Sequence, residues 1–245
     1  MPKPPRKMSR NRVALRACRN ILKTARAIRQ RHSQRVGKTR TADAYIIDAL
    51  IDKALKTARA ILLLANRDYA EDAFILARSL AGLTIDLAYL SANDKDRFIS
   101  YRAVGRTARR RMAEQCGFSP PDAEAMDWQD VKARSKRWQR AGAIKARAEK
   151  ANRLRVYEYA YRHGSSYEHS DAWSLLTYDR SNPDGGVVLL HLALMVTSYA
   201  LTQAMESWSR FFDVTDSNGE AALKKHFLGA FPADTTIATH PRNGR

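Results

Sequence analysis

Apolar residues recur along most of the chain at intervals of three and four positions, the spacing of one face of an α-helix. Residues 10–31 show this on a basic background, and the predicted stripe consists of Val13, Ala17, Ile21, Ala25 and Ile28. No useful length alternates Val, Ile and Thr with polar residues, so no strand is predicted. The pattern therefore predicts an all-α fold, a helical bundle.

Capping and turn residues predict where these helices begin and end. Thr41 or Asp43 starts one helix, Asp68 caps the next, and Asn93 or Asp94 caps a third. The predicted helices are 10–31, 41–65, 68–91, 94–117, 130–151, 187–211 and 219–230. Residues 33–41 break the first helix, and the prolines of "SPPDAE" open a further segment at 119. "DRSNPDGG" at 179–186 predicts a turn.

This pattern divides the chain into a basic N-terminal arm or helix (1–40), a helical bundle domain (41–231) and a flexible C-terminal tail (232–245). Residues 187–205 contain no Asp, Glu, Lys or Arg and approach the length that spans a bilayer. Polar residues such as His191 and Gln203 are scattered through the stretch. A central bundle helix has the same composition, and we expect that role and no transmembrane span.

The net charge of +18 is unevenly distributed. Residues 1–40 carry fourteen Lys or Arg and no acid, and residues 97–155 carry sixteen basic and six acidic side chains. Such blocks attract polyanions, either nucleic acid or anionic lipid, although solubilising tails and solvated helix faces are also basic.

The second block holds the candidate nucleic-acid-binding residues: Arg109, Arg110, Arg111, Lys136, Arg137, Trp138 and Arg140. Cations interleaved with an aromatic ring can hold a phosphate backbone and stack a base. The alternative is a solvated helix whose Trp138 is turned inward.

Other motifs exclude several classes of protein. Two cysteines, Cys18 and Cys116, make no disulfide framework and fit a reducing compartment, so we expect a cytoplasmic protein. The basic N-terminus has no apolar segment behind it and is not a secretory signal. "VGKT" at 36–39 lacks the first glycine of a phosphate-binding loop. We expect no cofactor.

The stretch "YEYAYRHGSSYEHSD", residues 157–171, gathers two of the six histidines and an arginine among tyrosines, serines and acids. His163 and His169 are six positions apart, about 600° on an α-helix, so they are poor joint ligands and no metal site is predicted. Arg162 and His169 are seven apart, about 700°, and share a face with Ser166 between them. Glu158 lies one turn before Arg162.

Arg162 followed by His163 and, at R-x6-H spacing, His169 resembles the motif of the HEPN superfamily. Those domains are all-helical and commonly metal-independent ribonucleases of toxin–antitoxin, phage-defence and CRISPR systems. The resemblance implies a bacterial protein, an RNA substrate, a homodimer that shares the site, and an antitoxin or regulatory partner. RNA cleavage needs a base for the 2′-hydroxyl proton and a cation for the phosphoryl oxygens. His169 would be the base and Arg162 the phosphate clamp, with His163 or Ser166 as further polar contacts.

The sequence is also similar to an uncharacterised bacterial helical family with a Tyr-Arg…Ser…His-Ser signature, preceded by "ILARSLAGLTIDLAYL". This likeness covers roughly residues 45–210. An acid is expected six residues after Arg78, but that position is Thr84 and the nearest acid is Asp86. Arg78, Asp86 and Glu158 are therefore candidate supporting residues of the site.

Three functions follow from these patterns. The first is a metal-independent endoribonuclease of a bacterial defence or toxin–antitoxin type. The second is a non-catalytic nucleic-acid-binding or regulatory protein, and the third is a peripheral membrane protein that uses the same cations. The polar residues around Arg162 and His169 could instead form a satisfied network between packed helices, or bind a ligand without chemistry.

Overall fold

The structure, a computed structural model, describes residues 6–39, 41–92, 94–117, 127–140, 143–162 and 183–232. Within these ranges the regular elements are all helices and no strand occurs. The all-α prediction is confirmed for this part of the chain. The element bounds are α1 Arg6–Arg31, α2 Ser33–Lys38, α3 Ala42–Ala65, α4 Ala70–Leu90, α5 Lys95–Gln115, α6 Trp128–Gln139, α7 Ala143–Lys150, α8 Leu154–Val156, the π-helix η1 Tyr157–Arg162, α11 Pro183–Phe211 and α12 Ser217–Ala230.

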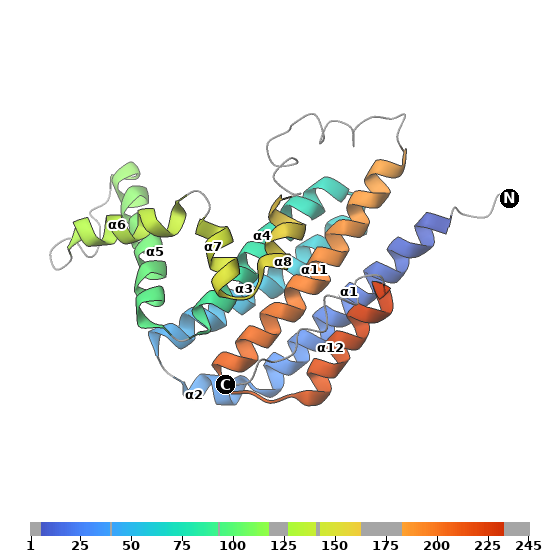
Figure 1. The fold of residues 1–245 in the computed structure, drawn as a ribbon, viewed down its shortest axis with the longest axis horizontal. Helices are drawn as coiled ribbons and strands as arrows, with labels where there is room; N and C mark the ends of the chain where they lie inside the picture. The colour runs from blue at the N-terminus through green and yellow to red at the C-terminus, as the bar shows by residue number, and fades with distance from the viewer. Residues whose placement is uncertain are drawn as a thin grey trace.

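The long helix α11 lies at the centre of the bundle (Figure 1). It packs against the α3–α4 hairpin on one side and against α1 and α12 on the other. Helix α7 and η1 pack on α4. Helices α5 and α6 pack mainly on each other, and they project from the bundle as a separate arm (Figure 1).

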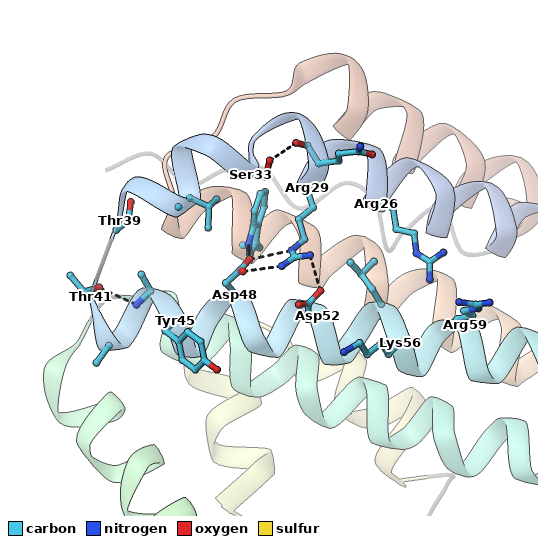
Figure 2. A pocket seen from close by; sticks show the side chains of 17 residues that line it. Arg26, Arg29, Ser33, Thr39, Thr41, Tyr45, Asp48, Asp52, Lys56 and Arg59 are labelled. Carbon is cyan, nitrogen blue, oxygen red and sulfur yellow. Dashed lines mark hydrogen bonds and ion pairs between the residues drawn. The ribbon is translucent and has the colours of Figure 1, made fainter.

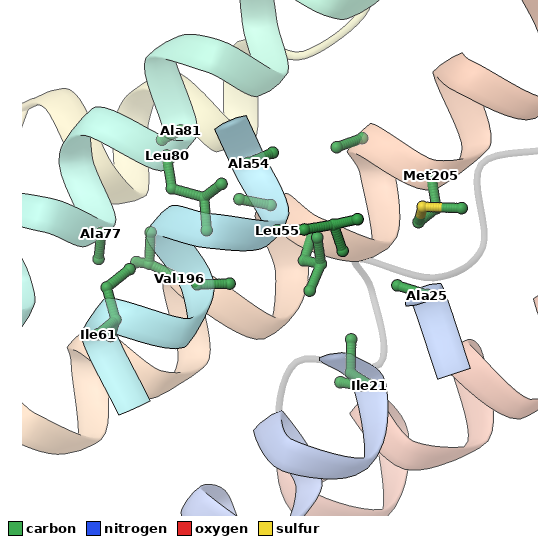
Figure 3. Close-up of a cluster of buried hydrophobic side chains, with 14 of the residues drawn as sticks. Ile21, Ala25, Ala54, Leu55, Ile61, Ala77, Leu80, Ala81, Val196 and Met205 are labelled. Carbon is green, nitrogen blue, oxygen red and sulfur yellow. The ribbon is translucent and has the colours of Figure 1, made fainter. Parts of the chain in front are cut away.

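Small side chains let these helices approach closely. Ala25 of α1, Ala54 of α3 and Ala77 of α4 are essentially fully buried, and they alternate with larger residues such as Ile21 and Leu80 (Figure 3). Alternation of small and large residues fills the space between facing helices at high density. Trp208 of α11 and Phe74 of α4 are the largest fully buried side chains among the described residues.

Helix α1 takes part in this core, although the sequence places residues 1–40 in a separate arm. Its buried face includes Ala14, Cys18, Ile21 and Ile28. The predicted stripe is wrong at Val13, which is 51% exposed. Four residues turn an α-helix by 400°, which is about 40° more than a full turn. A stripe that is extended towards the N-terminus only in steps of four residues therefore moves off the buried face.

The predicted caps are partly confirmed. The Oγ1 of Thr41 accepts a hydrogen bond from the backbone N–H of Ala44 at 3.1 Å and caps α3. The side chain of Asp94 caps α5 through the N–H of Asp96. The prediction for Asp68 is wrong, because α4 begins at Ala70 and Asp68 has φ +59°, a left-handed turn conformation that Asp tolerates.

Three boundaries also differ from the prediction. Residues 33–38 form the short helix α2 where a break is predicted. The predicted helix 130–151 is two helices, α6 and α7. Helix α11 begins at Pro183, inside the predicted turn at 179–186. Proline is favoured in the first turn of a helix, because the backbone N–H that it lacks would have no acceptor within the helix there.

Among the described helices, α4 and α11 are long and apolar enough to cross a membrane by length and composition alone. More than half of each apolar window is buried inside the bundle, as in the core helices of soluble proteins. This burial agrees with the core role predicted for residues 187–205. The predicted tail lies outside the described residues from position 233 onward.

Candidate nucleic-acid interface

The α5–α6 arm is held together by a narrow apolar seam. On α6 the buried positions are Val131 and Ser135, four residues apart, and on α5 Ala103 is buried. Asp127 caps α6 by accepting hydrogen bonds from the N–H groups of Gln129 (2.9 Å) and Asp130 (3.2 Å). The small seam leaves most of both helix surfaces in solvent.

Those solvent-facing surfaces carry cations. Besides Lys95 at the start of α5, the exposed ones on α5, on α6 and at the C-cap of α6 are Arg109, Arg111, Lys132, Lys136, Arg137 and Arg140. On α6, Lys132 and Lys136 each follow a buried position by one residue, so each lies about 100° round the helix from Val131 or Ser135, and Arg137 lies farther round. Within the described ranges none of these six forms an ion pair with an acid. Six positive charges therefore face solvent without a counter-charge from those ranges.

Two described acids of the arm, Glu114 and Asp130, are engaged with other arginines. Glu114 accepts from Arg110 at 2.8 Å, and Asp130 accepts from Arg134 at 2.7 Å. The Arg110 guanidinium also lies 4.3 Å from the centre of the Trp128 ring. These pairs are local, i to i+4, and within the described part of the arm they leave the outer cations without an acid partner.

Trp138 lies at the base of the arm and packs inward. Its ring makes edge contacts with Tyr89 and Tyr101, at centroid distances of 5.7 Å and 5.4 Å. The guanidinium of Arg147 lies 4.4 Å from its ring centre. The Trp138 ring is thus surrounded by aromatic rings and a guanidinium of the protein itself. This agrees with the alternative interpretation of the basic segment, a solvated helix whose Trp138 is turned inward.

Arg147 connects this aromatic cluster to Asp86 of α4. Its Nε donates to Asp86 Oδ1 at 2.8 Å, and its Nη1 donates to the carbonyl oxygen of Trp138, also at 2.8 Å. Burial raises the pKa of Asp86, and the charge of Arg147 opposes that rise. Burial, followed by the charge of Asp86, raises the pKa of Tyr101.

The partner of Asp86 was unexpected. The family pattern pairs Arg78 with an acid at position 84, which is Thr84 here, and the hydrogen-bonded partner that the structure gives the nearest acid, Asp86, is Arg147 from α7. The guanidinium of Arg78 lies instead over the ring of Tyr161 at 4.6 Å. Thr84, at the position where an acid was expected, is fully buried and donates towards the carbonyls of Leu80 and Ala200.

A pocket of ≈ 700 Å³ opens beside Asp86, between α3, α4, α6, α7 and η1. Lys53 and Arg140 contribute cations to its lining, and Gln139 and Ser79 contribute polar groups. Arg140 also belongs to the outer cationic row of α6, so that row ends at the pocket. This volume is within the range of small-ligand sites.

The π-helix η1 forms one wall of this pocket through Tyr161. Tyr157 and Tyr161 stack at 5.7 Å. The ring of Tyr161 lies against Gly82 of α4, where a Cβ would be 3.1 Å from the Tyr161 hydroxyl oxygen. Gly82 thus permits the close approach of η1 to α4.

The predicted catalytic residues fall at and beyond the end of this element. His163, Ser166 and His169 lie outside the described residues, and of Arg162 only the backbone is described, as the last residue of η1. Glu158 is exposed on η1. The α-helical angles assumed from residue 157 onward are wrong for 157–162, because a π-helix closes i to i+5 hydrogen bonds and turns more widely.

Sequence reasoning missed three residues of this site: Tyr101, Arg147 and Tyr161. Arg147 could not be told apart from the other cations of residues 132–155, because its partner Asp86 lies 61 residues away in the sequence. A pattern of charges on one helix cannot reveal a partner on another. The one available signal was Asp86 itself, an acid within an otherwise apolar helix.

Comparison with known proteins gives one match. No curated protein and no solved structure matches the chain. A family model matches residues 44–186, more than half of the chain, and this range contains every residue that lines the pocket beside Asp86. The protein therefore belongs to the family described as a family of unknown function (DUF5677).

Proposed function

We propose that this protein binds RNA along the α5–α6 arm. The observation that carries the proposal is the row of exposed cations on the arm, none of them paired with an acid in the described ranges. A polyanion that neutralises such a row releases its own counterions, which favours binding and makes it depend on salt. The projection of the arm gives a long strand access to the row (Figure 1).

The pocket beside Asp86 supports single-stranded RNA as the ligand. Arg140 belongs to both the cationic row and the pocket lining. A strand that follows α6 therefore reaches a pocket large enough for one nucleotide. Unpaired bases can enter such a pocket, whereas stacked and paired bases cannot.

The test is the salt dependence of RNA affinity. Replacing Lys132, Lys136 and Arg137 by Gln removes three outer cations of α6 without touching its buried seam. The slope of log Kd against log salt for a single-stranded RNA oligonucleotide should fall by about 2, since each neutralised phosphate contributes about 0.7 for single strands.

A matched control removes the same charge elsewhere. Arg67, Lys224 and Lys225 are exposed on other parts of the described bundle, and their replacement by Gln should leave the slope within about 0.5 of the unmodified protein's value. Equal slopes for the arm variant and the control would refute the assignment of the arm.

We propose in addition that the bound RNA is cleaved without a metal ion, with His169 as the base and Arg162 as the phosphate clamp. The proposal rests on the R-x6-H spacing and is supported by the position of Arg162 at the end of η1, next to the pocket wall residue Tyr161. π-Helices are rare and frequently occur at functional sites.

The cleavage proposal predicts that the purified protein degrades single-stranded RNA in EDTA and that His169→Ala abolishes this activity. The variant should retain its circular dichroism spectrum and RNA affinity. Cleavage that persists in His169→Ala would remove the role of His169. No cleavage by the unmodified protein would leave RNA binding as the function.

A further inference from the structure

A second and larger pocket, ≈ 1030 Å³, lies on the other side of α3. It is a groove between α1–α2 and the first three-quarters of α3 (Figure 2), and Trp208 of α11 is one of its lining residues. The groove shares no lining residue with the pocket beside Asp86. It is therefore independent of the RNA-binding arm.

One face of α3 forms a wall of the groove. Tyr45, Asp48, Asp52, Lys56 and Arg59 recur at intervals of three and four residues, so they lie in a line along one side of the helix. The line reads aromatic, acid, acid, cation, cation. At 1.5 Å per residue it extends over about 20 Å.

The centre of the groove is fixed by Arg29. Its Nε and Nη2 donate to the two carboxylate oxygens of Asp48 at 3.2 Å and 2.9 Å, and its Nη1 lies 2.7 Å from Asp52 Oδ1. Trp208 Nε1 donates to Asp48 Oδ1 at 3.3 Å. Asp48 is thus fully engaged, whereas the side chain of Asp52 is 43% exposed and retains an oxygen that can accept from a ligand.

One end of the groove is strongly cationic. Arg26 of α1 lies at the same end as Arg59 of α3, and Lys56 is next to them (Figure 2). All three are exposed, and none forms an ion pair within the described ranges. Like charges presented by two facing helices repel each other, and a bound dianion would relieve that repulsion.

We infer that this groove binds a small phosphate ester whose hydroxyl groups lie next to its phosphate. The phosphate lies among Arg26, Lys56 and Arg59, where guanidinium forks can make paired hydrogen bonds to its oxygens. The adjacent Asp52 accepts from the hydroxyl groups. A nucleic-acid strand fits less well, because Asp48 and Asp52 would face a backbone that carries a negative charge at every residue.

Two kinds of molecule share this chemistry, sugar phosphates and nucleotides. Isothermal titration of the full chain with ribose 5-phosphate, ATP and inorganic phosphate distinguishes them. At least one of the two esters should bind ten times more tightly than inorganic phosphate. Similar affinity for both esters indicates a sugar phosphate site, and a clear preference for ATP indicates that the base is also held, towards Tyr45.

The variant that tests the site is Arg26→Gln with Arg59→Gln, which should weaken binding of the preferred ester at least tenfold. Lys224→Gln with Lys225→Gln, on α12, removes equal charge and should leave the affinity within twofold. Asp52→Asn should weaken the ester but not inorganic phosphate.

The inference is overturned if neither ester binds more tightly than inorganic phosphate, or if the α12 control loses as much affinity as the groove variant. RNA binding by the α5–α6 arm is measured separately and does not depend on this result.

Discussion

Asp86 and Arg147 illustrate how single residues tie the arm to the bundle. Their side chains are only 19% and 12% exposed, and the pair joins α4 to α7. A buried ion pair of this kind has a desolvation cost that its attraction only partly offsets, but either partner left alone is much more costly. The pair therefore fixes the position of α7 and Trp138 more than it adds net stability.

Removing one partner should therefore destabilise the protein strongly. We expect Asp86→Ala to lower the free energy of unfolding by about 2–3 kcal/mol, because Arg147 is left without its carboxylate. The double variant Asp86→Leu with Arg147→Met should lose less stability than the sum of the losses of Asp86→Leu alone and Arg147→Met alone, with a coupling of about 1–2 kcal/mol. Urea denaturation measures all of these values, and additive losses would contradict the coupling.

The raised pKa of Asp86 gives a pH dependence with a definite sign. Burial makes the folded state hold this proton to a higher pH than the unfolded state does. As pH rises from the ordinary aspartate pKa through the raised value, this group lowers the stability of the folded state. The difference in the free energy of unfolding between the unmodified protein and Asp86→Asn should therefore become smaller as pH rises over that interval. A difference that rises with pH would contradict this assignment.

The two cysteines should differ in reactivity. Cys18 is fully buried, and burial raises its pKa to about 12, whereas Cys116 is exposed. Because the thiolate is the reactive form, a thiol reagent at pH 8 should modify Cys116 rapidly and Cys18 only when the protein opens. In the Cys116→Ser variant the remaining thiol, Cys18, should react slowly, and urea should accelerate the reaction because it opens the protein. Fast reaction of Cys18 in the native protein would contradict its burial between α1 and the core.

At the scale of elements, the sequence predicted local features and missed those that depend on packing. The caps at Thr41 and Asp94 are visible because each side chain bonds to a backbone N–H two or three residues away. The left-handed turn at Asp68 and the π-helical form of 157–162 were not visible. The π-helix packs on α4, and propensity within a short window carries no information on that contact.

The contact between α1 and α12 can be tested through two glycines of α12. A Cβ at Gly219 would lie 2.7 Å from Cγ1 of Ile28, which is buried, whereas at Gly229 nothing lies within 4 Å. Gly219→Ala should therefore destabilise the protein by about 1–2 kcal/mol through overpacking. Gly229→Ala should be neutral or stabilise it by up to about 1 kcal/mol through helix propensity. Thermal unfolding compares the two, and equal effects would mean that the helices are not so close at Gly219.

At the scale of the whole molecule, α1 belongs to the fold as much as to the charge distribution. Its exposed cations supply much of the N-terminal basic block, while Ala14, Cys18 and Ile21 are buried completely. Charge and packing at this helix must therefore be separated experimentally.

Deletion of residues 1–31 should expose the apolar faces of α11 and α12. We expect the truncated protein to lose cooperative unfolding and to bind a hydrophobic dye. By contrast, replacing the exposed residues Arg12, Arg16 and Lys23 by Gln removes charge from α1 but keeps its buried face, and should leave the melting temperature within a few degrees. A truncated protein that still unfolds cooperatively would show that α1 is dispensable to the core.

The position of α1 also has a consequence for synthesis. Its main partners, α11 and α12, begin about 150 and about 185 residues after α1 ends. On the ribosome this helix is made early, yet the helices that cover its apolar face are made much later. At typical elongation rates the wait is on the order of ten seconds. During that interval the apolar face of α1 is open to chaperones or to neighbouring nascent chains, so translation speed between residues 32 and 183 should influence the yield of folded protein.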